Sequence, residues 1–264
     1  MLSKYDIDKY IDSIPPISKI VKETLYYLDN SDMVQAANIA KEDRVFSNYL
    51  SQIVNKPIFG FRNEITNLNQ IFGILGLGRA KQIVSSYYLH IILPNEWEVL
   101  NFSNQKFQDL QANLITQWNI ILNALEIKNK DLQQSIVLIP AALIVCEMLL
   151  KDIKSTIVLL KETKDISYDE ILYKMSGLRL FDIVKKIAIK WEFNDSIISF
   201  IRELSQYDKE DDVKKEIIFM RLLISHEMSK PYAIDSGLND FFNFPLNFEE
   251  KDIMQFYSML KMGQ

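Results

Sequence analysis

Histidine and cysteine, on which many metal and nucleophilic sites depend, are scarce in this sequence. The 264 residues contain two histidines and one cysteine, Cys146. A lone cysteine cannot form an intramolecular disulfide, and Cys146 lies in an apolar stretch where a thiol packs as a small buried hydrophobe. We therefore expect a reducing compartment and assign the chain to the cytoplasm.

A basic excess and a long hydrophobic run are also missing. The formal net charge is −5, so broad electrostatic binding to nucleic acid or to an anionic membrane is not expected. The longest apolar run, Ile136 to Cys146, is shorter than the roughly 20 residues of a membrane span and contains Pro140. The N-terminus has no uninterrupted apolar segment typical of a secretory signal. We expect no membrane association.

Strand-like alternation is hard to find, whereas apolar residues recur at helical spacing along most of the chain. Such stripes predict amphipathic helices. They run over residues 17–28, 46–53, 68–75, 80–91, 107–125, 180–191, 213–224 and 253–260. We predict an all-α, multi-helix bundle in which Trp118 and Trp191 face the core.

A shift in composition after Pro94 suggests two parts. A polar connection, PNEWEVLNFSNQ, separates the early short helices from a longer helix for which Ser103 is a plausible N-cap. We predict an N-terminal helical bundle over residues 1–95 and a C-terminal helical subdomain over residues 103–264. Within the latter, Ser167 and Glu170 have the spacing of a capping box.

Several motifs occur together between Ile14 and Tyr88. They are Pro15-Pro16, an acidic helix start at Asp43, the N-x-x-x-F-G segment from Asn55 to Gly60, Ile65, and Leu75-Gly76-Leu77 followed by Arg79. In this order they resemble the HDOD family of bacterial signalling domains. The resemblance implies a helical fold related to the HD metal-dependent phosphohydrolases, with the metal-binding histidines and aspartates generally missing. It weakens after about the first hundred residues, where the chain looks like a diverged HD-type helical half.

The chemistry of an HD phosphohydrolase can be tested against the residues. Such an enzyme needs several imidazoles and carboxylates around a divalent metal that activates water. The resemblance would place its adjacent His-Asp ligands in the segment from Pro140 to Leu150, where we expect aliphatic residues, and its first histidine near Asn113. A His-Asp pair occurs nowhere in the sequence. We predict no catalytic residues, no bound metal and no cofactor.

The two histidines do not suggest a site. His90 lies on an apolar helix, where packing or hydrogen bonding is more common than metal binding. His226 begins HEMSK, in which Lys230 replaces the second histidine of an H-E-x-x-H zinc motif. An acidic run over residues 208–212 lacks the spacing of a calcium loop and is interpreted as a solvated helix start.

A glycine-rich segment from Gly73 to Ala80 has part of the spacing of a phosphate-binding loop. However, Arg79 and Ala80 stand where that loop needs lysine and a hydroxyl residue. We predict a helix–helix turn in which Gly76 and Gly78 allow a left-handed cap and close backbone approach. Anion binding at the start of the following helix is the alternative.

These observations favour a noncatalytic signalling or regulatory module that acts through protein–protein interaction with an unidentified partner of a bacterial signalling pathway. Asn55 and Arg79 are the candidate interaction residues, and the guanidinium of Arg79 can contact a carboxylate through two hydrogen bonds. Two alternatives stay open. One is a metal-dependent phosphohydrolase with atypical ligands, and the other is a sensor of a nucleotide or small molecule, with its pocket between the N-terminal bundle and the C-terminal half.

Overall fold

The computed structural model describes residues 2–164, 166–205, 213–239, 241–242, 244 and 248–262. Over these residues the regular structure is entirely helical, which confirms the predicted all-α fold. In this part of the chain, no helix combines the length and apolar character needed to cross a membrane. The elements are α1 (Lys4–Ser13), α2 (Lys19–Asp29), α3 (Met33–Ala40), α4 (Arg44–Val54), η1 (Pro57–Phe59), α5 (Leu68–Ile91), α6 (Asn104–Ala124), α7 (Lys130–Ser135), η2 (Ile136–Leu138), α8 (Ala141–Leu150), η3 (Lys151–Ile153), α9 (Lys154–Lys164), α10 (Tyr168–Ser176), α11 (Leu180–Lys190), α12 (Asp195–Leu204), α13 (Lys215–Met228), α14 (Pro231–Ile234) and α15 (Glu250–Met262).

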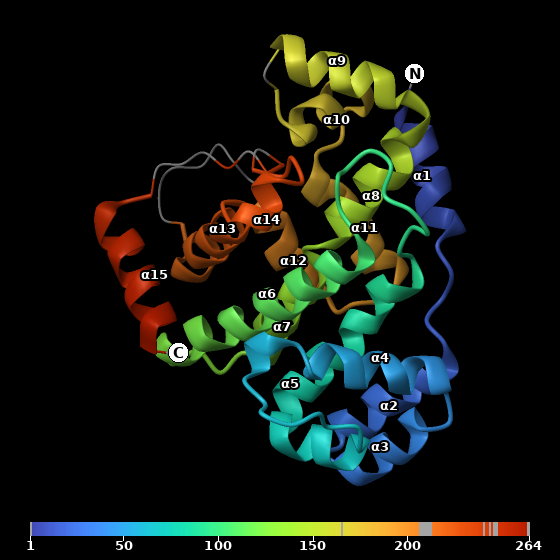
Figure 1. The fold of residues 1–264 in the computed structure, drawn as a ribbon, viewed down its shortest axis with the longest axis vertical. Coiled ribbons are helices and arrows are strands. Elements are labelled where there is room, and N and C mark those ends of the chain that lie inside the picture. The colour runs from blue at the N-terminus through green and yellow to red at the C-terminus, as the bar shows by residue number, and fades with distance from the viewer. Residues whose placement is uncertain are drawn as a thin grey trace.

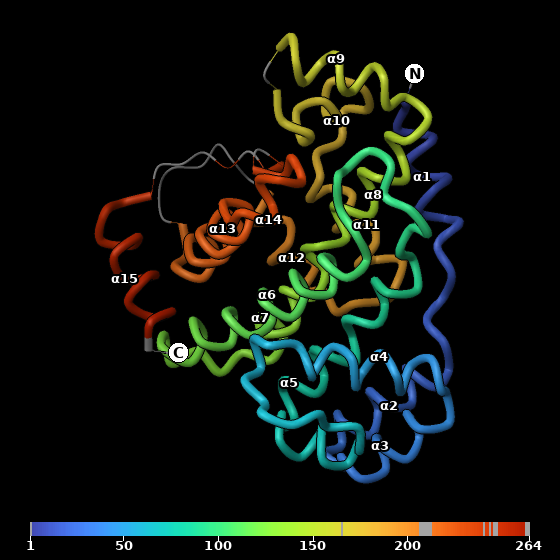
Figure 2. Tube along the Cα trace, viewed as in Figure 1, coloured from blue at the N-terminus to red at the C-terminus, as the bar shows by residue number. Residues whose placement is uncertain are grey.

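The helices α2 to α5 pack on one another and form one end of the molecule (Figure 1). From there α6 runs through the middle, where it contacts α13 and α15, while α9 and α10 lie at the opposite end. The first helix, α1, packs against helices that are distant from it in sequence. Figure 2 shows α1 beside α8 and α11, and the ammonium of Lys186 on α11 lies 2.8 Å from the carboxylate of Asp8 on α1.

Side-chain caps explain where several helices begin. Asp43 accepts hydrogen bonds from the backbone N–H groups of Val45 and Phe46, so it caps α4 as the acidic helix start predicted. Ser103 caps α6 through the N–H of Lys106, which confirms that prediction as well.

The cap at the start of α10 is simpler than the predicted box. The Ser167 hydroxyl accepts from the N–H of Glu170 at 3.1 Å. The carboxylate of Glu170 lies 2.8 Å from the Lys174 ammonium instead of returning to the backbone of Ser167. A pair of opposite charges four residues apart on a helix competes with the reciprocal cap, so only half of the predicted capping box forms.

A kink at Gly76 divides α5 into two helices. Gly76 has φ 71° and ψ 167°, a conformation that is essentially restricted to glycine, and this confirms the predicted turn. Gly78 differs from the prediction because its backbone stays helical. Glycine is needed at this position because the Gln133 side chain of α7 approaches closely. A Cβ at Gly78 would lie 2.6 Å from Oε1 of Gln133.

The core is continuous through both ends of the molecule and contains the two predicted tryptophans. Trp118 is fully buried and its indole N–H donates to the carbonyl oxygen of Leu132 at 2.9 Å. Trp191 is 5% exposed, packs edge-on against Tyr88, and donates to the carbonyl oxygen of Pro15 at 3.2 Å. Tyr88 and Pro15 lie within the first 95 residues, so Trp191 connects the N-terminal and C-terminal parts of the chain.

Candidate functional site

The segment where the HD dyad was expected forms α8, a helix that is buried along most of its length. It is not purely aliphatic. Glu147 is 1% exposed, and its carboxylate accepts hydrogen bonds from the backbone N–H groups of Glu98, Val99 and Leu100. The prediction of aliphatic residues here missed this carboxylate, which fastens the connection between α5 and α6 onto α8.

A second buried carboxylate lies beside Asn113, the predicted counterpart of the first metal-binding histidine. Glu227 on α13 is fully buried, and it accepts from the side-chain amides of Gln117 at 2.7 Å and Asn113 at 3.3 Å. The ammonium of Lys230 pairs with it, and the hydroxyl of Tyr232 donates to it at 3.0 Å. Burial and the charge of Glu227 raise the pKa of Tyr232, so this phenol stays protonated.

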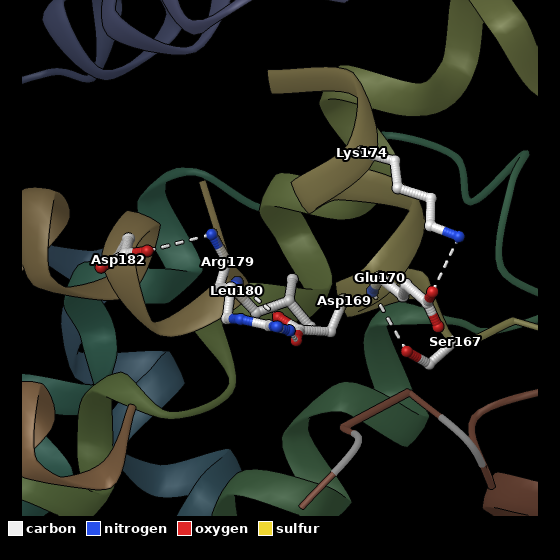
Figure 3. A network of polar contacts seen from close by, with 7 residues as sticks. All are labelled: Ser167, Asp169, Glu170, Lys174, Arg179, Leu180 and Asp182. Carbon is white, nitrogen blue, oxygen red and sulfur yellow. Dashed lines mark hydrogen bonds and ion pairs between the residues drawn. The ribbon is translucent and has the colours of Figure 1, made fainter. Parts of the chain in front are cut away.

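A third buried carboxylate joins α10 to α11 (Figure 3). Asp169 is fully buried, accepts from the Arg179 guanidinium at 2.7 Å, and accepts from the backbone N–H of Leu180 at 2.8 Å. Burial, followed by the charges of Asp169 and Glu147, raises the pKa of the Cys146 thiol well above its ordinary value. A thiol held protonated in this way is a poor nucleophile.

These three carboxylates are parts of separate networks. Within the described ranges, histidine, cysteine, aspartate and glutamate side chains form no group of three or more that could hold a metal ion. The acidic run over residues 208–212 lies outside the described residues. Each of Glu147, Asp169 and Glu227 is occupied by hydrogen-bond donors of the chain itself, so the arrangement fixes helices and connections.

Both histidines pack against aromatic rings. His90 lies 4.8 Å from the ring centre of Tyr49 and 5.4 Å from that of Tyr87, and burial lowers its pKa. The ring centre of His226 lies 5.7 Å from the ring centres of both Phe256 and Tyr257 on α15. Burial and the charge of Lys230 lower the pKa of His226. The position of His90 agrees with the packing or hydrogen-bonding role predicted for it, and that of His226 with a structural role.

Asn55, one of the two candidate interaction residues, holds the end of α4 against the chain that follows η1. Its side-chain N–H groups donate to the carbonyl oxygens of Ser51 and Ile65, both at 2.8 Å. Its side-chain oxygen accepts from the N–H of Ile65 at 2.9 Å. These bonds give Asn55 a structural role, whereas its contact with a partner stays a prediction.

Arg79, the other candidate, is half-buried just after the kink of α5. Burial lowers the pKa of its guanidinium, which nevertheless keeps its charge at neutral pH. No hydrogen bond or ion pair joins it to a described residue. Between Asn55 and Arg79, Ile58 and Ile74 expose 38% and 48% of their surface, so this segment also presents apolar groups to solvent.

Comparisons with known proteins agree with the helical architecture. Two crystal structures are similar over nearly the whole chain. An HDOD domain protein of unknown function from Geobacter sulfurreducens has a TM-score of 0.68 at 14% identity, covering 98% of this chain and 87% of that one. A protein from Shewanella amazonensis SB2B, described as a "putative phosphohydrolase", has a TM-score of 0.63 at 12% identity, covering 97% and 93%.

At these identities the likeness to solved structures concerns the fold alone. None of the curated proteins compared with the chain matches it. The comparison with protein families is specific, because the HDOD domain matches residues 14–207 and so includes every motif from Pro15-Pro16 to Arg79. This chain therefore belongs to the HDOD domain family.

Proposed function

We propose that this chain is a noncatalytic regulatory module of a bacterial signalling pathway and acts by binding a protein partner. The observation that carries the proposal is that the charged guanidinium of Arg79 is partly desolvated by burial but forms no ion pair with the described residues. Arg79 also lies in the segment that carries the family motifs. A planar guanidinium of this kind gains most from a carboxylate supplied by another molecule.

The fate of the buried carboxylates supports a binding role over hydrolysis. Metal-assisted hydrolysis requires ligands with free lone pairs that converge on one ion. The carboxylate oxygens of Glu147 and Glu227 instead accept hydrogen bonds from backbone and side-chain donors of the chain. The proposal places the protein in the cytoplasm, where a buried free thiol such as Cys146 stays reduced.

Replacing Arg79 with alanine tests the proposal. We expect the variant to lose partner binding by about thirtyfold, the effect of removing a central interface arginine, with helicity and melting temperature nearly unchanged. Affinity capture from the native cell extract measures the first effect, and circular dichroism the second. Arg62, an exposed arginine of the same segment, supplies the matched control Arg62→Ala, which should capture the partner as the wild type does.

Two results would contradict the proposal. One is a destabilised Arg79→Ala variant with unaltered partner capture, because Arg79 would then act inside the fold. The other is hydrolysis of cyclic nucleotides by the purified chain that a chelator abolishes, since this requires a catalytic metal.

A further inference from the structure

A cleft with two lobes opens between the N-terminal helices and the C-terminal half. The first lobe, of about 300 Å³, lies between α5, α6, α7 and the connection from α6 to α7. The second, of about 320 Å³, lies between α2, α5, α7 and the connection from α11 to α12. Lys81, Lys130 and Gln134 line both lobes, so the two spaces are neighbours. Together they reach the size range of small-molecule sites.

Asn119 and Gln133 line the first lobe and belong to a ring of amides that the fully buried Gln82 completes behind the wall. Gln133 donates to Oδ1 of Asn119, Asn119 donates to Oε1 of Gln82 at 2.6 Å, and Gln82 donates to the carbonyl oxygen of Gln133 at 2.6 Å. This closed ring connects α5, α6 and α7 and holds the Gln133 amide against Gly78, where a Cβ would clash. The wall is thus fixed before any ligand arrives, which lowers the entropic cost of binding.

The charge inside the first lobe is positive. Lys81 is recessed, with 11% of its side chain exposed, and its recorded partner among the described residues is Asp29. An ammonium group has three N–H donors, so two remain for a ligand. Lys128 and Lys130 are exposed at the rim, and none of the described residues that line this lobe is acidic. The first lobe is therefore suited to an anionic group.

The second lobe has a different chemistry. Tyr88, Trp191 and Phe193 contribute an aromatic wall, and three carboxylates, those of Asp29, Asp131 and Glu192, line the same lobe. Each already has one partner in the chain: Lys81 for Asp29, the Asn194 amide for Asp131 and Lys22 for Glu192. Aromatic faces favour planar rings, and carboxylates accept hydrogen bonds from amino groups. Between the lobes, Oε1 of Gln134 is buried without a hydrogen-bond partner among the described residues. A buried acceptor without a partner is costly.

We propose that this cleft binds a nucleotide, with the phosphate beside Lys81 and Lys130 in the first lobe and the base against the aromatic wall of the second. The recessed position of Lys81 favours a small ligand over an acidic peptide, whose backbone would have to enter a space of this size. The site extends the proposed function, because the cleft lies between the N-terminal helices and the C-terminal half.

Calorimetric titration of the intact chain with adenosine and guanosine monophosphates tests the proposal. At least one should bind saturably at one site per chain. Adenosine or guanosine, ribose 5-phosphate and inorganic phosphate should each bind at least about tenfold more weakly, because each lacks one of the two groups that the lobes recognise.

Variants locate the binding. Lys130→Glu should weaken nucleotide affinity by about tenfold or more, because it removes one hydrogen bond to a charged group and adds a repulsive charge. Position 130 is the first residue of α7, where an acidic side chain favours the helix, so folding should be unaffected. Asn123→Trp, at an exposed position lining the first lobe, should block binding by filling space. Lys154→Glu, an equal charge change at an exposed site on α9, should leave affinity unchanged.

Four results would overturn the inference. They are no saturable binding of either nucleotide, equal weakening by Lys154→Glu and Lys130→Glu, inorganic phosphate binding as tightly as the nucleotides, and an acidic peptide that binds the cleft while nucleotides fail to displace it. The titration uses the purified chain alone, so its failure is distinct from a failure of partner capture by Arg79.

Discussion

The two ends of the molecule treat buried charge differently. In the C-terminal half, Glu147, Asp169 and Glu227 are almost completely removed from water and are each held by several donors. Among residues 2–95 no carboxylate is buried to that degree, and the Asn55 amide fastens the loop after α4 instead. Losing one partner of a buried charge is far more costly than losing a neutral hydrogen bond. The comparison therefore describes a C-terminal half locked by charge and an N-terminal bundle held mainly by apolar packing.

The largest effect is expected from breaking a lock in the C-terminal half. Glu147→Ala would leave the N–H groups of Glu98, Val99 and Leu100 without an acceptor. We expect the free energy of unfolding to fall by about 3–5 kcal/mol. Urea denaturation followed by circular dichroism measures it. Glu96→Ala, at an exposed site in the same connection, is the control and should change stability by less than about 0.5 kcal/mol.

If Glu147→Ala proves as mild as its control, charge does not lock this half, and the contrast between the two ends fails. A large loss confined to the variant would instead locate the lock at the contact between α8 and the connection from α5 to α6.

A smaller effect should follow from the backbone of the N-terminal bundle. Gly76→Ala places a Cβ on a residue with φ 71° and ψ 167°, although no atom lies within 4 Å of that Cβ. The expected cost of about 1–3 kcal/mol is therefore pure backbone strain. Gly73→Ala, in the helical part of α5 and also in open space, should raise stability by about 0.5–1 kcal/mol.

Opposite signs for these two alanines, measured as shifts in melting temperature, would support the kink as a fixed feature. A neutral Gly76→Ala would mean that α5 can straighten, and the N-terminal bundle would then be less defined than the structure shows.

The smallest effect concerns pH. Burial lowers the pKa of His226 below its ordinary value of 6.5. As the pH falls, the unfolded chain therefore binds a proton at this residue before the folded chain does, which favours unfolding. Stability should decrease from about pH 7 to about pH 5. His226→Gln should reduce that dependence, measured by denaturation at several pH values, and His90, whose pKa burial also lowers, should supply part of the remainder. An unchanged slope would assign the dependence to other groups.

Local signals made much of the fold predictable. Asp43 and Ser103 cap helices through neighbours two or three residues away, and Gly76 lies between two apolar stripes, over residues 68–75 and 80–91. The role of Glu147 could not be predicted, because its donors lie 47 to 49 residues away in a connection with no regular structure. A single acid inside an apolar run was the available signal.

The sequence suggested a nucleotide or small-molecule pocket between the N-terminal bundle and the C-terminal half only as an alternative, and such binding stays a prediction. The two lobes of the cleft are lined by helices from both parts of the chain. Its amide ring joins Gln82, Asn119 and Gln133, and each is an unremarkable polar residue on its own helix. Such a network depends on how three helices cross, which periodicity alone does not determine.

The position of α1 has a consequence for how the chain is made. Its buried residues Ile7 and Ile11 face α8 and α11, and Lys190 reaches the carbonyl oxygen of Asp12 across 178 positions of sequence. At synthesis rates of about 5–20 residues per second, α1 waits roughly 9–36 s for that partner to emerge. Until α8 and then α11 have emerged, the apolar face of α1 lacks its partners, so α1 should be among the last helices to dock and should be open to a chaperone while it waits.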